Sequence, residues 1–406
     1  MGIEGFFNSL KKDYSIITEL YPDTKKNYNI DSLFFDFNAI IHVISQRVMK
    51  SNNSNENEII KQIKLFLKNL IKKRFNKLKL IYISIDGVPS KAKIVEQKKR
   101  RFMGMFVTHV HNFIKKKNNM EVKRKWNRSL NISPGTSFML KLNSELNKFK
   151  KELNCQVILS GFKERGEGET KIVNYINENN VGENVCIHSP DADVILLALL
   201  LKNKQIKKLY VLREDPQKTA KFAKNIIDSV DAMIDIKRLE NIIMLQFKGK
   251  DRKSIINDIV FIFTFFGDDF LHKLESINVT LDIKFLVDIY KKYLQKNSYI
   301  LKEFNNTIEI DYNNFLKFLE HIIPYEDYFL KRNYLVNTFY NAKRIFKNKD
   351  PSAKDHSIFK YILEKQKLVK WPETIYDRYH SNKIDSKNNY KVDIYQFDHM
   401  LDEYRF

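Results

Sequence analysis

The chain has 406 residues, of which 43% are apolar and 30% are charged, and its formal net charge is +22. This length is enough for one large domain or two ordinary domains, and the apolar content allows a substantial core. The longest clean apolar run, VILLALLL at 194–201, is too short for a membrane-spanning helix. The excess of Lys and Arg is compatible with a polyanionic partner such as nucleic acid.

The N-terminal stretch and the cysteines indicate an intracellular protein. MGIEGFFNSLKK lacks the apolar segment of a secretory signal. Cys155 and Cys186 each lie in an apolar stretch, so we expect reduced thiols. The histidines of HVH (109–111) have no third ligand nearby, so a zinc site is not expected. We expect an intracellular location, cytoplasmic rather than nuclear.

Strand-like runs alternate with helix-like segments over the first two thirds of the chain. In chain order, the strand-like runs are LIYISIDG (80–87), CQVILSG (155–161), NVCIHSPD (184–191) and KLYVLRED (208–215). Helical patterns lie among them, for example at 57–75 and 141–153. This alternation predicts an α/β fold with a mainly parallel central sheet flanked by helices on both faces. From about residue 280 the pattern is mainly helical and aromatic, so we expect a catalytic core at 1–280 and a helical segment packed on it at 281–406.

Acidic residues recur at the apolar runs. Asp36 stands inside the run SLFFDFNAIIH (32–42), where an unpaired charge is costly to bury. The others stand at or just past the ends of four further runs, and they are Asp86, Glu167, Glu169, Asp191, Asp193, Asp268 and Asp269. The C-terminal ends of parallel strands lie along one edge of a sheet, so carboxylates from five distant segments can converge there.

Converging carboxylates repel one another, and hard divalent cations such as Mg²⁺ and Mn²⁺ offset that repulsion because they prefer oxygen ligands. Two such ions about 4 Å apart stabilise the attacking and leaving oxygens in phosphodiester hydrolysis. Taken singly, each acid has a simpler interpretation, since Asp191 and Asp193 can cap the helix that follows. Five acidic sites at five apolar segments together favour the metal cluster.

A basic segment that follows Asp86, SKAKIVEQKKRRF (90–102), has a helical pattern. Four of its residues fall on one face of a helix, and they are Lys93, Gln97, Arg100 and Arg101. This face can bind a terminal phosphate, because Arg binds phosphate oxygens bidentately and Lys adds a point charge. We expect Ala92, Val95 and Phe102, on the opposite face, to pack. Alternatively, KKRR (98–101) is a nuclear-localisation patch or a solvated helix face.

Seven blocks that occur in order along residues 1 to 280 resemble the Xrn-type 5′-to-3′ exoribonuclease family. They are FFDFNAIIH, SIDGVPSKAKIVEQKKRRF, ISPGTSFM, GEGETKI, PDADVILL, LRED and FFGDDFL, and the N-terminal MGIEGFF is also similar. The resemblance implies a core like that of PIN and flap-type nucleases. It also implies magnesium-dependent hydrolysis of single-stranded RNA that carries a 5′ monophosphate, with release of mononucleotides. Decapped or cleaved RNA would then be the substrate, as in mRNA decay.

The family's site residues can be carried over position by position. Its catalytic and metal-binding acids match Asp36, Asp86, Glu167, Glu169, Asp191, Asp193 and Asp269. Its phosphate pocket matches Lys93, Gln97, Arg100 and Arg101, and His42 matches a histidine that stacks on the first base. The implied cofactor is a pair of Mg²⁺ ions, for which Mn²⁺ can substitute. Two positions depart from the family, Ala39 for a usual Gly and Thr170 for a usual His, and neither is a proposed ligand.

Two other functions compete with the exoribonuclease. A flap-type, structure-specific DNA nuclease would carry a Gly-rich helical hairpin after the last acidic block, whereas LHKLESINV (271–279) has no glycine. A non-catalytic binder of RNA 5′ ends would be expected to have lost metal ligands first, and none is missing from the sequence.

Overall fold

The computed structural model describes most of the chain between Ile3 and Lys349. Residues 1–2, 4, 15–16, 21–28, 50–54, 76, 121–125, 216–218, 220, 222–224, 226–228, 269–270, 306 and 350–406 lie outside the described residues. The chain divides into two compact units, one of Met1–Gly2 and Tyr14–Leu245, the other of Ile3–Asp13 and Gln246–Phe406. The boundary at residue 280, which separates a catalytic region from a C-terminal segment, stays a prediction.

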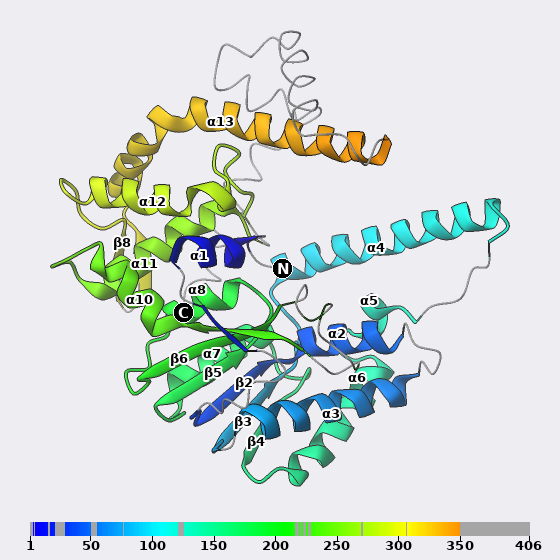
Figure 1. The fold of residues 1–406 in the computed structure, drawn as a ribbon. Coiled ribbons are helices and arrows are strands. Elements are labelled where there is room, and N and C mark those ends of the chain that lie inside the picture. Colours follow the sequence, from blue (N-terminus) through cyan, green and yellow to red (C-terminus); the bar gives the residue numbers. More distant parts are fainter. Residues whose placement is uncertain are drawn as a thin grey trace. The chain divides into compact units, whose positions relative to one another are not determined.

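The first unit contains a seven-stranded sheet with the order β1-β7-β6-β5-β2-β3-β4 (Figure 1). Its parallel strands are β2 (Ser32–Asp36), β3 (Leu80–Ser84), β4 (Gln156–Ser160), β5 (Asn184–His188) and β6 (Lys208–Glu214). Two antiparallel strands, β7 (Asp231–Asp235) and β1 (Ile17–Leu20), extend the sheet beyond β6. The predicted mainly parallel sheet is therefore confirmed, and the four predicted strands are all part of it.

Helices cover both faces of the sheet, as predicted. The core on one face is formed with α2 (Phe37–Val48), α3 (Glu56–Arg74) and α6 (Ser137–Phe149), and it includes the side chains of Leu33 and Phe35. Because alternate side chains of a strand point to opposite faces, Phe34 points the other way, and its ring centroid lies 6.1 Å from that of Tyr175. Tyr175 belongs to the second helical layer, which contains α7 (Gly168–Glu178), α8 (Asp193–Leu199) and α10 (Ile236–Leu245).

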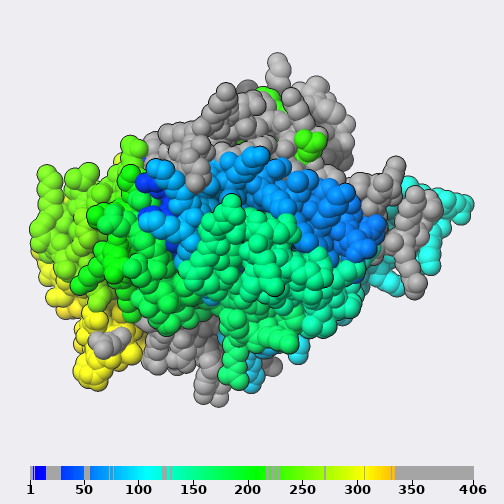
Figure 2. All heavy atoms as spheres, turned by 90° about the horizontal axis from the view of Figure 1, so that it is seen from below, coloured from blue at the N-terminus to red at the C-terminus, as the bar shows by residue number. Residues whose placement is uncertain are grey.

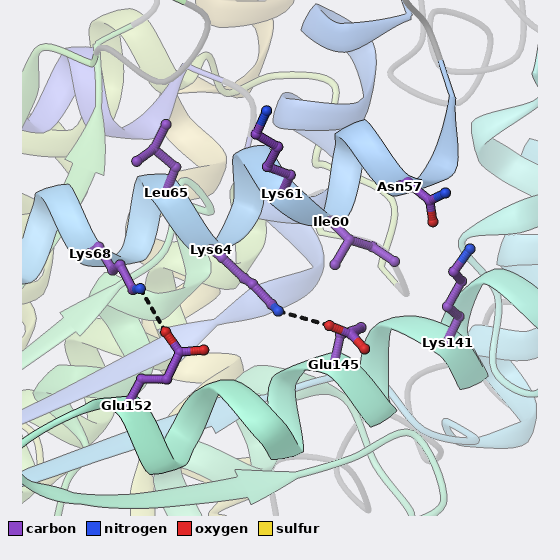
Figure 3. Close-up of a pocket in the computed structure, with 9 residues that line it drawn as sticks. All are labelled: Asn57, Ile60, Lys61, Lys64, Leu65, Lys68, Lys141, Glu145 and Glu152. Carbon is purple, nitrogen blue, oxygen red and sulfur yellow. Dashed lines mark hydrogen bonds and ion pairs between the residues drawn. The ribbon is translucent and has the colours of Figure 1, made fainter.

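A groove lies between α3 and α6 on the surface of the first unit. Figure 2 shows α3 in blue beside the teal region that contains α6. Two ion pairs cross the groove: Lys64 Nζ lies 2.8 Å from Glu145 Oε2, and Lys68 Nζ lies 2.6 Å from Glu152 Oε2 (Figure 3). Its volume is about 610 Å³, and none of the predicted site residues that the structure describes lines it. The other elements of this unit are α4 (Lys91–Lys117), α5 (Arg128–Asn131) and η1 (Lys150–Glu152).

The second unit is mostly helical, as expected for the C-terminal part. Its elements are α1 (Phe6–Tyr14), α11 (Arg252–Phe263), η2 (Thr264–Phe266), α12 (Val279–Tyr293), β8 (Leu301–Phe304), β9 (Thr307–Ile310) and α13 (Tyr312–Lys349). In its core the ring centroids of Phe6 and Phe263 are 5.5 Å apart. The buried carboxylate of Asp258 accepts hydrogen bonds from the main-chain N–H groups of Ile300 and Leu301, both at 2.8 Å. Among the described helices, none is long and apolar enough to cross a membrane.

The apolar run FIFTFFGDDF (261–270) is not part of the sheet. Its first residues end α11 and form η2, in the second unit. A short apolar run does not by itself distinguish a buried strand from a buried helix. Asp268 caps a turn by accepting a hydrogen bond of 2.7 Å from the N–H of Leu271, and Asp269 lies outside the described residues. The expectation that this run is a strand of the sheet is therefore wrong, and a place for its acids beside the sheet edge stays a prediction.

Candidate metal centre

Asp36 lies at the point where β2 ends and α2 begins. It is the last residue of the strand, with φ −72° and ψ 95°, and Phe37 starts the helix. The run SLFFDFNAIIH is thus two elements, and Asp36 stands at a strand's C-terminal end like the acids after β3 and β5. The buried Ser189 donates a hydrogen bond of 2.9 Å to Asp36 Oδ2. The Ser189 hydroxyl therefore partly compensates the charge of the buried Asp36 carboxylate. The Asp36 carboxylate also lies close to the neighbouring acids.

Acids from three elements converge at this edge of the sheet. One carboxylate oxygen from each of Asp36, Glu169 and Asp191 lies within 4.8 Å of the other two. The strand order explains the meeting, because β2 lies between β5, which precedes Asp191, and β3, which precedes Asp86. Glu169 joins them from the first turn of α7.

Gly168 fits between two of these carboxylates. Its N–H donates a hydrogen bond of 2.7 Å to Asp86 Oδ1. A Cβ atom at this position would lie 3.0 Å from Asp36 Oδ1 and 3.3 Å from Asp86 Oδ1. The glycine in GEGE therefore allows the backbone of α7 to approach both strand ends, which brings Glu169 into the cluster.

Burial and mutual repulsion raise the pKa values of the clustered acids. Burial is the largest cause for Asp36 and for Glu169, and the neighbouring carboxylates raise both pKa values further, well above the usual range. Burial also raises the pKa of Asp86. An ion that prefers oxygen ligands would relieve this repulsion, and a donor set made only of carboxylates suits Mg²⁺ or Mn²⁺.

Two further polar residues support the acids, and sequence reasoning missed both. Asn38 Nδ2 donates to Asp86 Oδ2 at 2.7 Å, and the N–H of Asp86 donates to Asn38 Oδ1 at 3.2 Å. The buried Lys171 donates from Nζ to the carbonyl oxygens of Ile85 at 2.8 Å and Gly161 at 2.9 Å, so an ammonium group lies at the ends of β3 and β4. Their only signal in the sequence is that each stands two residues after a predicted ligand.

The helix α8 does not use Asp191 or Asp193 as a cap. Its N-cap residue is Ala192, and no side chain makes a capping hydrogen bond there. Asp191 instead donates its N–H to Ser189 Oγ at 3.2 Å and points a carboxylate oxygen into the cluster. Asp193 begins α8, and its charge contributes to the raised pKa of Glu169. The capping interpretation of these two acids is therefore wrong.

Lys93 connects the basic helix α4 to the acids. It stands in the first turn of α4, whose N-cap Ser90 accepts a hydrogen bond from the Lys93 N–H. Lys93 is only 8% exposed, and its Nζ lies 3.2 Å from Glu167 Oε2. Glu167 is the N-cap residue of α7. One member of the predicted phosphate pocket therefore contacts one of the predicted metal ligands.

The rest of the predicted phosphate pocket contacts residues on its own helix. Arg100 is exposed, and its Nε donates to Glu96 Oε1 at 2.9 Å. Arg101 Nη2 donates to Gln97 Oε1 at 3.4 Å. These residues share the face of α4 that the spacing predicted, and their side chains are joined in pairs one helical turn apart.

His42 lies one helical turn after Asn38 on α2 and is half-buried. Burial, followed by the positive charges of Arg128 and Arg100, lowers the pKa of His42 to about 4, so the ring is neutral at neutral pH. Arg128 donates from Nη1 to the His42 carbonyl oxygen at 3.4 Å and to Gln46 Oε1 at 2.9 Å. This arginine adds a cation near His42 that the sequence alone did not single out.

Residues 1–215 match the family described as XRN 5′-3′ exonuclease N-terminus. The chain belongs to the XRN 5′-3′ exonuclease family. Residues 249–398 also match the Xrn1 helical domain, and the resemblance inferred from the seven blocks is confirmed.

XRN relatives are found in a virus and in yeasts. A protein of Acanthamoeba polyphaga mimivirus, named as a 5′-3′ exonuclease, is 34% identical over 54% of this chain and 38% of its own length. The 5′-3′ exoribonuclease 1 of Schizosaccharomyces pombe is 26% identical over 72% of this chain and 24% of its own length. The 5′-3′ exoribonuclease 2 of Kluyveromyces lactis is 27% identical over 73% and 36%, respectively. The chain thus spans well under half the length of these relatives.

Proposed function

We propose that this XRN-family chain is a divalent-metal-dependent 5′-to-3′ exoribonuclease that hydrolyses single-stranded RNA with a 5′ monophosphate into mononucleotides. The observation that carries the proposal is the meeting of Asp36, Glu169 and Asp191, with one oxygen from each within 4.8 Å of the others. The names of the yeast relatives support RNA as the substrate. The basic helix α4, joined to the acids through Lys93, supports a phosphate-bearing end as the part that is recognised.

The carboxylates of Asp36, Glu169 and Asp191 would hold one Mg²⁺ ion. A second ion would be held with the remaining proposed ligands, which are Asp86, Glu167, Asp193 and Asp269. When bound, such ions lower the pKa of water and stabilise the leaving oxygen of a phosphodiester. The protein's own part is to hold the ligands still, through the hydrogen bonds from Ser189 to Asp36 and from Asn38 to Asp86. Asp269 is included because it matches the family motif.

Recognition of the 5′ end is assigned to one face of α4 and to His42. Lys93 supplies a partly desolvated positive charge beside the acids, and Gln97, Arg100 and Arg101 extend the donor set along the helix. Arg100 would exchange the carboxylate of Glu96 for the terminal phosphate. The neutral ring of His42 would stack on the first base. We expect the size of this phosphate site to exclude a triphosphate or a cap.

The first test compares mononucleotide release from three single-stranded RNAs that differ only in the 5′ group. We expect rapid release from the 5′-monophosphate RNA and slow release from the 5′-hydroxyl and 5′-triphosphate RNAs, and a chelator should stop all release. Equal rates on all three RNAs would contradict the assignment of the phosphate pocket. Faster cleavage of flap DNA than of RNA would favour the structure-specific DNA nuclease instead.

The second test separates turnover from binding. The double variant Asp191→Ala/Asp193→Ala should lose Mg²⁺-dependent release while it still binds 5′-monophosphate RNA, because Lys93 and the arginines remain. Asp288→Ala, which removes an exposed acid of α12, is the control and should keep wild-type rates. Wild-type protein that binds the RNA tightly but never releases nucleotides would be a non-catalytic 5′-end binder.

A further inference from the structure

The outer face of α4 exposes a line of large apolar side chains. Val95 is 61% exposed, Phe102 62%, Phe106 53% and Phe113 62%. We call these four residues the α4 stripe. The sequence predicted that Val95 and Phe102 would pack, and that prediction is wrong. In Figure 1 the C-terminal half of α4, in cyan, extends beyond the sheet and its flanking helices in the first unit.

The α4 stripe follows the helical repeat. Its members stand at positions i, i+7, i+11 and i+18, which fall on the same side of an α-helix. At 1.5 Å per residue, the stripe is about 27 Å long, and Phe102 and Phe106 are about 6 Å apart along the axis. Exposed lysines border it near each end, with Lys98 and Lys99 at one end and Lys116 and Lys117 at the other.

This patch is large enough to need an explanation. Three phenylalanines that are each more than half exposed leave roughly 300–400 Å² of aromatic surface in water. An apolar patch of this size is often a functional surface. The aromatic side chains point to nucleic-acid bases, because planar rings along one line offer platforms on which bases can stack.

The positive charge of α4 favours one kind of binding partner for the stripe over another. Residues 91–117 contain nine Lys or Arg and one acid, Glu96, which is already bonded to Arg100. Two copies of α4 packed face to face would bring these basic runs within about 8 Å, which is about one Debye length at physiological ionic strength, so salt would screen their repulsion only in part. A strand of RNA has the opposite properties, since its phosphates attract the lysines and its bases have apolar faces. The same helix also carries Lys93, where the 5′ phosphate is proposed to dock.

We propose that the α4 stripe is a stacking platform for the body of the single-stranded RNA whose 5′ end occupies the site at Lys93. The proposal rests on the proposed function. The stripe and Lys93 lie on opposite sides of the helix, so the strand would pass halfway around α4. For a helix about 11 Å across that path is about 17 Å, which an extended strand covers in roughly three or four nucleotides. RNAs shorter than this would reach the end pocket but not the stripe.

The test measures binding by fluorescence anisotropy, in EDTA to prevent turnover, with 5′-monophosphate oligouridylates of about 2 and about 20 nucleotides. We expect the triple variant Phe102→Ser/Phe106→Ser/Phe113→Ser to bind the long RNA about tenfold more weakly or worse, and the short RNA unchanged. The tyrosine triple variant should keep wild-type affinity, and the leucine triple variant, which is apolar but cannot stack, should not. The control Leu140→Ser/Leu245→Ser changes exposed apolar residues elsewhere in the first unit and should bind both RNAs normally.

Several outcomes would contradict the proposal that the α4 stripe is a stacking platform. The serine triple variant would do so if it bound the long RNA as wild type does, or if it lost the short RNA equally. If the wild type were a dimer, the same variant a monomer, and RNA binding unchanged, the stripe would instead be the surface that binds a second copy of the chain. If the serine triple variant lost binding to phosphatidylserine vesicles but kept RNA binding, the stripe would be assigned to a membrane surface. A long 5′-hydroxyl RNA separates the two proposals, because it should still depend on the stripe even if 5′-phosphate recognition or turnover fails.

Discussion

Replacing Asp36 by Asn should stabilise the protein in the absence of metal. Asp36 takes part in two of the three close carboxylate pairs formed with Glu169 and Asp191. A pair of unit charges about 5 Å apart costs roughly 3 kcal/mol at an effective dielectric constant of about 20, so with all three acids ionised the two pairs that include Asp36 would cost about 6 kcal/mol. Because such groups retain protons rather than bear that cost, we expect Asp36→Asn to raise the free energy of unfolding by about 2–4 kcal/mol near pH 8. Asn can still accept the hydrogen bond from Ser189.

The stability gained by Asp36→Asn should be larger at high pH than at low pH. The pKa of Asp36 is raised in the folded protein, so folding takes up a proton between the ordinary pKa of about 4 and the raised value. The stability of the wild type in EDTA should therefore fall as the pH rises through this window, and the advantage of Asp36→Asn should shrink toward about pH 4. Mg²⁺ should stabilise the wild type and have little effect on the variant.

The assay is urea unfolding followed by the fluorescence of Trp126, whose ring packs against Phe138 in the first unit with centroids 5.1 Å apart. Trp371 is the only other tryptophan, so a Trp371→Phe background leaves Trp126 as the sole reporter. Asp231→Asn is the matched control: Asp231 is buried too, but it lies 2.7 Å from an Arg74 nitrogen, so its loss should destabilise. The reasoning would be refuted if Asp36→Asn were less stable than wild type near pH 8. It would also be refuted if the substitution changed the free energy of unfolding equally near pH 8 and near pH 4.

Three further predictions concern neighbours of the acids. Lys171→Met should lower the free energy of unfolding by about 2–4 kcal/mol, because two buried carbonyl oxygens lose their donor, and urea unfolding measures it. Gly168→Ala should reduce Mg²⁺-dependent RNA hydrolysis about tenfold or more with little change in melting temperature, since the added methyl group would lie 3.0 Å from Asp36 Oδ1; wild-type rates would contradict the tight approach. His42→Phe should retain 5′-monophosphate RNA hydrolysis with the wild-type pH profile between about pH 5 and 8, because the His42 pKa of about 4 keeps the ring neutral there; a lost pH dependence would show that its charge matters.

Much of the fold could be predicted because its signals are local. Four short apolar runs predicted four strands, and the acids after them predicted where a site would form. The switch from strand to helix at Asp36 was not predicted, because apolar residues continue on both sides of it. The run FIFTFFGDDF shows the same ambiguity, since it is helical in the structure although its composition also suits a strand.

The sequence by itself determined which residues carry charge in apolar surroundings and, through the order of its blocks, the family of the chain. Only the tertiary structure decided which of those charges meet. Asp36, Glu169 and Asp191 are brought together by the order of β5, β2 and β3 and by a glycine at the start of α7. It also decided that Lys171 and Asn38 support the acids and that the outer face of α4 is exposed. The reason is physical: a side chain's type is encoded locally, whereas its neighbours depend on how distant elements pack.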